Sequence, residues 1–161
     1  MLNELEVTRV WDNLLAAEAR SLYFGDLAAR YTNTKQIITG VSFFCSSGAA
    51  AALIGKLPPQ VAIILSLIVA AATAYSIAVG LDRKVATMAK LLSSWKLIAL
   101  DYEKLWNNVY SADAGVKLQE ILKSEEEPAD LATTEAPNDQ KLLGKWQDRV
   151  FSLHRVADQN V

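Results

Sequence analysis

The 161-residue sequence has few of the residues from which catalytic and metal sites are built. Its one cysteine, Cys45, excludes an intrachain disulfide, and its one histidine, His154, cannot form a metal site or a catalytic triad by itself. No glycine-rich phosphate loop follows a strand pattern, and no nucleophile elbow is present. We therefore expect a protein that is not an enzyme and that uses no cofactor or metal.

Charge is almost absent from one stretch of the chain. Lys56 is the only charged residue between Gln36 and Leu81, although charged residues make up 21% of the sequence. Ile37–Gly55 and Val61–Leu81 are both uncharged. As helices they would span roughly 28 and 31 Å, close to the thickness of the hydrocarbon core of a bilayer. The sequence therefore predicts a two-transmembrane hairpin over residues 36–81. The alternative, a hairpin buried in a soluble core, would need more chain than remains to cover two helices that are apolar all round.

The segment Lys56-Leu57-Pro58-Pro59-Gln60 joins the two predicted membrane helices. Its charge and its two prolines favour a tight turn in water at the far membrane face. Positive charge is concentrated on the outer flanks of the hairpin, which predicts that both termini are cytoplasmic. The flanking cations are Arg30, Lys35, Arg83, Lys84, Lys90 and Lys96. Because the chain starts with acidic and polar residues rather than with a signal peptide, we expect the hairpin to direct its own insertion.

Each predicted membrane helix carries a stripe of hydroxyl-bearing residues. At about 100° per residue, the hydroxyls of each helix fall on one face. They belong to Thr39, Ser42 and Ser46 in the first helix and to Ser66, Thr73 and Ser76 in the second. Such residues either allow close helix packing or line a pore, and the sequence leaves both roles open. No acidic or basic residue lies in the middle of either segment, which argues against a proton relay or a voltage sensor.

The flanks of the hairpin have helical patterns of their own. Residues 1–35 predict a cytoplasmic amphipathic helix, and residues 82–124 predict a cytoplasmic stalk followed by a short helix. The stalk carries a heptad seam formed by Val85, Met88, Leu92, Trp95, Ala99, Tyr102, Trp106 and Val109. Leu91, Ile98 and Leu105 widen its apolar face.

This apolar face of the stalk can pack on the amphipathic helix of the same protomer or against other protomers, and we expect both. With no Gly or Pro between Leu81 and Ser111, we expect the second membrane helix and the stalk to form one rod.

The remainder of the chain alternates in charge. Residues 125–139 contain six acidic residues, two prolines and no Lys or Arg, a composition that predicts a flexible acidic linker. Residues 140–161 predict a basic amphipathic helix. Its cations Lys141, Lys145, Arg149 and Arg155, or the juxtamembrane Arg83 and Lys84, are candidates to bind an anionic ligand or lipid headgroups. The alternative is a solvated helix face without a ligand.

The plan of the chain resembles that of the SLATT group, two-transmembrane bacterial effectors associated with nucleotidyltransferases in phage defence. The likeness extends over residues 8 to 125. It rests on Trp11-Asp12, Glu18-Ala19-Arg20, Ala28-Ala29-Arg30-Tyr31 and Leu81-Asp82-Arg83-Lys84, together with the short hairpin. The resemblance implies an effector of the bacterial inner membrane that forms a pore or disrupts the membrane. It also implies control by a nucleotide or oligonucleotide signal from a partner nucleotidyltransferase.

Two helices cannot enclose an aqueous path, so a pore requires a ring of protomers, which the heptad stalk could hold together. We therefore expect an all-α integral membrane protein that assembles as a homo-oligomer and acts as a nucleotide-gated pore or ion channel in the lipid bilayer. Two alternatives remain: a non-conducting, membrane-anchored scaffold that recruits a soluble partner, and a holin-like lysis protein.

Overall fold

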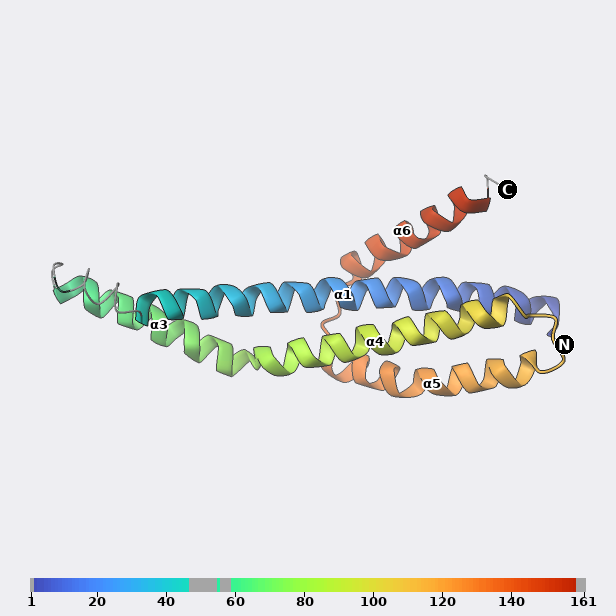
Figure 1. Cartoon of the computed structure of the whole chain (residues 1–161), viewed down its shortest axis with the longest axis horizontal. Coiled ribbons are helices and arrows are strands. Elements are labelled where there is room, and N and C mark those ends of the chain that lie inside the picture. The colour runs from blue at the N-terminus through green and yellow to red at the C-terminus, as the bar shows by residue number, and fades with distance from the viewer. Residues whose placement is uncertain (1, 47–54, 56–58, 159–161) are drawn as a thin grey trace. The chain divides into compact units, whose positions relative to one another are not determined.

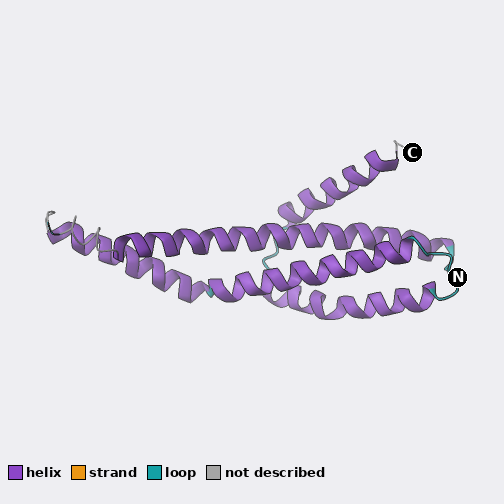
Figure 2. Ribbon diagram, in the orientation of Figure 1, coloured by secondary structure: helices purple, strands orange, loops and turns teal. Residues whose placement is uncertain are grey.

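The computed structural model describes residues 2–46, 55 and 59–158 of the chain. This part contains five helices and no strand (Figure 2), which confirms the all-α expectation for it. The helices are α1 (Glu4–Ser46), α3 (Pro59–Val79), α4 (Leu81–Trp106), α5 (Ala114–Glu135) and α6 (Gln140–Asp158). Residues 47–54 of the first predicted membrane helix and residues 56–58 of the predicted turn lie outside the described residues.

The chain divides into two units. The first unit consists of Met1–Ala28 and Thr87–Val161, and the second unit consists of Ala29–Ala86. In the first unit, α1, α4 and α5 lie side by side, and α6 leaves this group at an angle (Figure 1).

The pairing of α1 with α4 in the first unit is antiparallel, because residues later in α1 meet residues earlier in α4. The Trp11 and Trp106 rings lie 4.9 Å apart, Asn13 Nδ2 donates to the Tyr102 hydroxyl over 3.1 Å, and the Arg20 guanidinium carbon lies 4.4 Å from the Trp95 ring centroid. Helix α5 joins α4 through an ion pair of 2.6 Å between Lys90 Nζ and Glu127 Oε1. Both members of this pair are exposed, so apolar burial rather than charge holds the helices together.

The apolar stripe of α4 supplies much of the buried core. Among the predicted seam residues, Met88, Trp95, Ala99, Tyr102 and Val109 are buried, and Val85, Leu92 and Trp106 are partly buried. The three widening residues Leu91, Ile98 and Leu105 are buried as well. The stripe therefore packs inside the protomer, which is one of the two uses that its spacing predicts. Its use between protomers stays a prediction.

The predicted continuous rod is wrong. Helix α3 ends at Val79, α4 begins at Leu81, and the two are bent by 43° at this break. Gly80 lies between them with φ of +63°, a left-handed conformation that glycine adopts at little cost because it has no Cβ. Its N–H donates to the carbonyl of Ile77 over 3.1 Å and so closes the end of α3. The stretch without Gly or Pro begins at Leu81, and the glycine that ends the first helix lies one residue before it.

The predicted flexible linker is also wrong for residues 125–135, which continue α5. Pro128 lies inside this helix and is buried. One face of α5 is buried, and it consists of Ala114, Leu118, Ile121 and Pro128. The helix that contains the acidic segment therefore has an apolar side, which a count of its acidic residues does not reveal. The helix stops before Pro137, and Asp139 then starts α6 because its Oδ1 accepts the N–H of Leu142 over 3.0 Å.

The burial pattern of α4 predicts that truncating two of its leucines changes the free energy of unfolding by different amounts. Leu91→Ala removes a fully buried side chain, and we expect it to lower the free energy of unfolding by about 2–5 kcal/mol. Leu97 is 60% exposed, so Leu97→Ala should change it by less than about 0.5 kcal/mol. Urea unfolding in detergent micelles, followed by tryptophan fluorescence, measures both, since the four tryptophans (11, 95, 106 and 146) all belong to the first unit. Equal losses would contradict this packing.

Candidate functional site

The second unit exposes large apolar side chains on α1 and on α3. In α1, Phe43 and Phe44 are 76% and 66% exposed, and in α3, Leu67 and Ile77 are 64% and 75% exposed. No residue described between positions 29 and 79 is buried. Exposed apolar surface costs roughly 25 cal/mol per Å² in water, so a surface of this kind favours a covering of lipid or of protein.

The length and hydropathy of a helix decide whether it can cross a membrane. Within the described residues, no single helix is both long and apolar enough to cross a bilayer. The bent pair formed by Ile63–Val79 and Leu81–Trp106 satisfies these two criteria when taken together.

The hydroxyl stripe of the hairpin divides into two sets. Ser42 and Ser76 are partly buried, whereas Thr39, Ser66 and Thr73 are exposed; the Ser46 side chain lies outside the described residues. In α3 the partly buried positions recur with 3-4 spacing and therefore share one face: Leu65, Val69, Ala72, Ser76 and Val79. Helical periodicity places the hydroxyls of each helix within one sector of its surface. It does not predict which residues of that sector face the other helix. The partly buried set suits helix packing, and the exposed position of the other set suits pore lining.

Two charged contacts join α1 to the start of α4 within the second unit. Lys35 Nζ lies 2.5 Å from Asp82 Oδ1, and Lys84 Nζ lies 5.6 Å from the centroid of the Tyr31 ring. The side chains of the ion pair are 49% and 81% exposed, so its contribution to stability is about 0–1 kcal/mol. Of the two predicted juxtamembrane cations, Lys84 therefore has an aromatic partner, and Arg83 is exposed on the neighbouring position.

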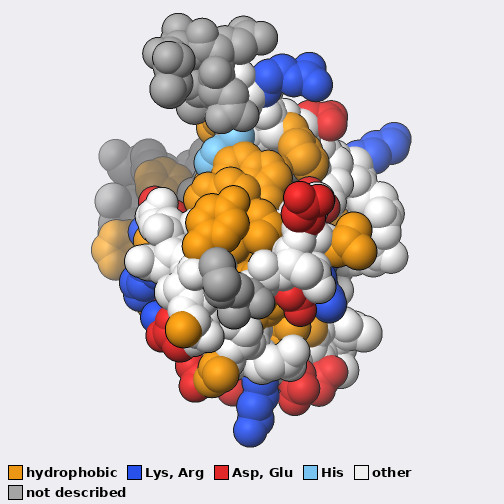
Figure 3. Space-filling model, turned by 90° about the vertical axis from the view of Figure 1, so that its right-hand side faces the viewer, with side chains coloured by type: hydrophobic (Ala, Val, Ile, Leu, Met, Phe, Trp, Pro, Cys, Tyr) orange, Lys and Arg blue, Asp and Glu red, His pale blue; other side chains and the backbone are white. Residues whose placement is uncertain are grey.

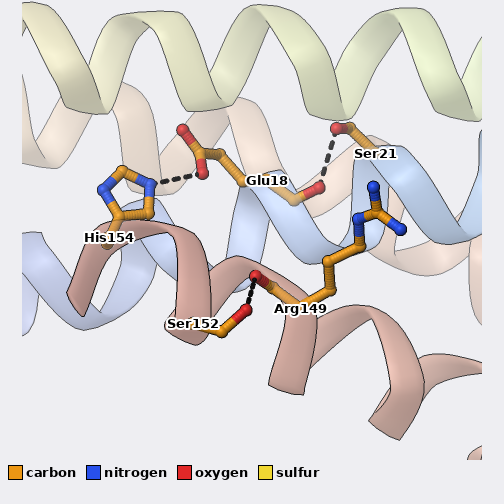
Figure 4. Close-up of polar contacts among 5 residues, drawn as sticks. All are labelled: Glu18, Ser21, Arg149, Ser152 and His154. Carbon is orange, nitrogen blue, oxygen red and sulfur yellow. Dashed lines mark hydrogen bonds and ion pairs between the residues drawn. The ribbon is translucent and has the colours of Figure 1, made fainter. Parts of the chain in front are cut away.

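Helix α6 is attached to α1 by an apolar cluster and by a polar contact between Glu18 and His154, which Figure 4 shows. Val150 is 1% exposed and packs in a cluster with Leu15 and Ala19. His154 Nε2 lies 2.8 Å from Glu18 Oε2, a contact that becomes an ion pair when the imidazole is protonated. The attachment brings together residues that are 136 positions apart, which the sequence pattern alone does not indicate.

The predicted basic residues of α6 are exposed: Lys141, Lys145, Arg149 and Arg155. Lys145 Nζ and the Arg149 guanidinium carbon lie 5.0 and 5.6 Å from the centroid of the Trp146 ring. Phe151 and Leu153 on the same helix are 55% and 59% exposed. Helix α6 therefore presents both cations and apolar side chains to its surroundings, as helices that lie on anionic membrane surfaces do.

An apolar patch lies beside the histidine in the view of Figure 3. Trp11 contributes to it, with its ring 4.9 Å from that of Trp106 and 5.2 Å from the imidazole of His154. Trp11 and Phe151 also line a shallow recess of about 540 Å³. Sequence reasoning missed this patch because its members come from three helices. Its local signal is Trp11 in the predicted amphipathic helix, and the pattern of that helix does not indicate which other helices the ring meets.

The sequence matches no protein-family model and no curated protein, and the structure matches no solved structure. In the described part of the chain, no three side chains of the His, Cys, Asp and Glu types are grouped so as to hold a metal ion.

The attachment of α6 predicts different effects for two substitutions on that helix. Val150→Asp would place a carboxylate against Leu15 and Ala19, and we expect α6 to detach because an unpaired buried charge costs several kcal/mol. Leu153→Asp adds the same charge at a position that is 59% exposed, so α6 should stay attached. Hydrogen exchange of the amides of α6 measures the outcome: protection falls by about 100-fold in the first variant and is retained in the second. Equal protection in both variants would contradict the observed attachment.

Proposed function

We propose that the chain is an oligomeric membrane effector of bacterial anti-phage defence. The hairpin, with membrane helices at 37–55 and 61–81, lies in the inner membrane and both flanks lie in the cytoplasm. The observation that carries this proposal is the apolar surface exposed on α1 and α3 in the second unit. Monomeric soluble proteins rarely expose contiguous apolar patches larger than a few hundred Å². Lipid would cover such a surface on all sides at once, whereas a single protein partner would cover one side.

The proposed activity is conduction of ions through a ring of protomers. The hydroxyls of Thr39, Ser66 and Thr73 are the best candidates to line the pore because their side chains are exposed in the single chain. Ser42 and Ser76 are better suited to packing within the hairpin. The apolar residues between the hydroxyls would close the pore by excluding water from its narrow parts.

Control by a nucleotide or oligonucleotide signal is proposed from the resemblance to the SLATT group. The exposed cations of α6 (Lys141, Lys145, Arg149 and Arg155) and the juxtamembrane pair Arg83 and Lys84 are candidate contacts for its phosphates. Such a signal shifts the balance of open and closed states only by the difference between its affinities for the two.

One observation favours a second candidate function, a non-conducting membrane-anchored scaffold. The stripe of α4 that could hold a ring of protomers together is largely buried within one chain. The first unit still offers the apolar patch around Trp11 and the exposed side of α6, to which a soluble partner could bind. For the holin-like alternative we find no comparable observation.

Membrane insertion is tested first on the unchanged protein, which we expect to stay in the membrane pellet after alkaline carbonate extraction. Leu67→Arg should reduce that fraction, since an arginine near the centre of a membrane helix costs about 2.5–3.5 kcal/mol on insertion scales. Leu97→Arg is the matched control, because Leu97 is 60% exposed, close to the 64% of Leu67, and lies in the first unit. Release of the unchanged protein into the soluble fraction would contradict the membrane proposal.

Conduction separates the two candidate functions. In planar bilayers we expect channel currents from the purified protein, and a severalfold smaller conductance for Thr39→Val and Thr73→Val, which replace exposed hydroxyls by methyl groups of similar shape. Thr8→Val, on the exposed side of α1 in the first unit, should leave the conductance unchanged. Absence of current from an oligomer of verified assembly, with and without nucleotide ligands, would contradict the pore and leave the scaffold.

A further inference from the structure

A cleft of about 510 Å³ lies within the first unit. Helices α1, α4 and α5 and the connection from α5 to α6 form its walls, and its polar lining includes Arg20, Tyr23, Trp95, Glu125, Asn138 and Asp139. Its volume falls within the range of small-molecule sites, about 300–1,000 Å³. None of the cations predicted from the sequence to bind a ligand belongs to this lining.

Arg20 and Trp95 form the electropositive side of the cleft. The Arg20 guanidinium carbon lies 4.4 Å from the centroid of the Trp95 ring, so the ring supports the cation from one face. Among the described residues, Arg20 forms no ion pair with a carboxylate. The fork of N–H groups on a guanidinium fits the oxygens of a carboxylate or a phosphate.

The indole N–H of Trp95 supplies a second, independent indication of a ligand. Trp95 is only 2% exposed, and its Nε1 has no hydrogen-bond partner within the part of the chain that the structure describes. A buried donor without an acceptor is unfavourable, and native structures satisfy nearly all such groups. Nε1 is closed to an atom the size of a water oxygen in this structure, so an acceptor oxygen of a ligand beside Arg20 would satisfy it once the side chains around the indole shift on binding.

The two carboxylates of the cleft already have other roles. Asp139 Oδ1 accepts the N–H of Leu142 over 3.0 Å at the start of α6. Glu125 lies near the Tyr102 hydroxyl, where burial and this carboxylate raise the pKa of the tyrosine. Neither carboxylate is paired with Arg20, so the positive charge of Arg20 stays available to a ligand. Their remaining oxygens are suited to hydrogen-bond donors on the uncharged part of that ligand.

We propose that this cleft binds a small organic molecule through a carboxylate or phosphate group, which pairs with Arg20 and accepts a hydrogen bond from the Trp95 indole N–H. The cleft lies wholly within the first unit, so this site does not depend on the proposed membrane function. A phosphate group would come from a nucleotide or a phosphorylated metabolite, and a carboxylate from an organic acid.

The indole N–H resonances of the full-length protein in detergent micelles test the site. Adenosine monophosphate, inorganic phosphate and succinate are added separately, at concentrations up to the millimolar range. We expect at least one probe to shift the Trp95 resonance in a saturable way while the resonances of Trp11, Trp106 and Trp146 stay in place. Adenosine monophosphate and phosphate report a phosphate site, and succinate reports a carboxylate site. Absence of any saturable Trp95 shift would overturn the proposal.

Two substitutions on α1 make the test specific. Arg20→Gln removes the cation from an exposed position, and we expect the affinity for the bound probe to fall about tenfold or more, as for the loss of a charge-assisted hydrogen bond. Arg9→Gln removes an exposed cation from the same helix outside the cleft and should leave the affinity unchanged. Equal affinities for the two variants would overturn the assignment of Arg20, whatever the outcome of the membrane experiments.

Discussion

The first unit depends on covering the broad apolar face of α4. A heptad seam alone would need one partner helix, but Leu91, Ile98 and Leu105 widen the face beyond what α1 covers by itself. Helix α5 supplies the additional cover, and its buried positions continue past the acidic run to Pro128. The cover is apolar throughout, since no polar or charged residue among those described is buried. Trp95 and Tyr102 bring their polar atoms into this interior as part of large aromatic side chains.

Periodicity in the sequence predicts which side of a helix is buried, but it does not predict which helix covers that side. The spacing from Val85 to Val109 predicted the buried side of α4, because a helix turns by a nearly constant angle per residue. It could not predict whether another helix of the same chain or another protomer covers that side. The same limit applies to the hydroxyls, where Ser42 and Ser76 separate from Thr39 and Thr73 only once the second helix is in place. Contacts such as Glu18 with His154 depend on the full fold and leave no local pattern.

The two errors in helix boundaries have distinct physical origins. At Gly80 one residue with a left-handed backbone conformation ends a helix between two segments that both favour helix. At Glu125–Glu127 the acidic composition suggested disorder, but Lys90 pairs with Glu127 and the opposite side of the helix is buried. Composition averages over the two sides of a helix, so it misses a segment with one charged side and one apolar side.

Burial of the α4 stripe also limits how protomers could assemble in the proposed oligomer. Side chains that already fill the interior of one protomer cannot also form contacts between protomers without reopening it. Contacts between copies would then fall to the hairpin, whose outer side chains are exposed. Gly40 is exposed there, and beyond its own turns of α1 no atom of the described residues lies within 4 Å of the position that a Cβ would take, so the backbone of another helix could approach it closely. Assembly through the hairpin would leave the first unit of each protomer intact and able to respond to a ligand.

Helix α6 is the element of the first unit that such a ligand could move most easily. It is attached by the small cluster around Val150 and by a contact between Glu18 and His154 whose side chains are 31% and 36% exposed, so its attachment is small beside the apolar core of α1, α4 and α5. Hydrogen bonds link the residues just before α6 to Tyr23 in the wall of the cleft. The Tyr23 hydroxyl donates to the carbonyl of Pro137 and accepts the N–H of Asp139 over 3.4 Å. Allosteric coupling energies are typically 1–3 kcal/mol, comparable to the cost of detaching an element held this weakly. Occupancy of the cleft would therefore act on α6 through residues 137–139, and the exposed cations of α6 would carry the change to whatever anionic surface they contact.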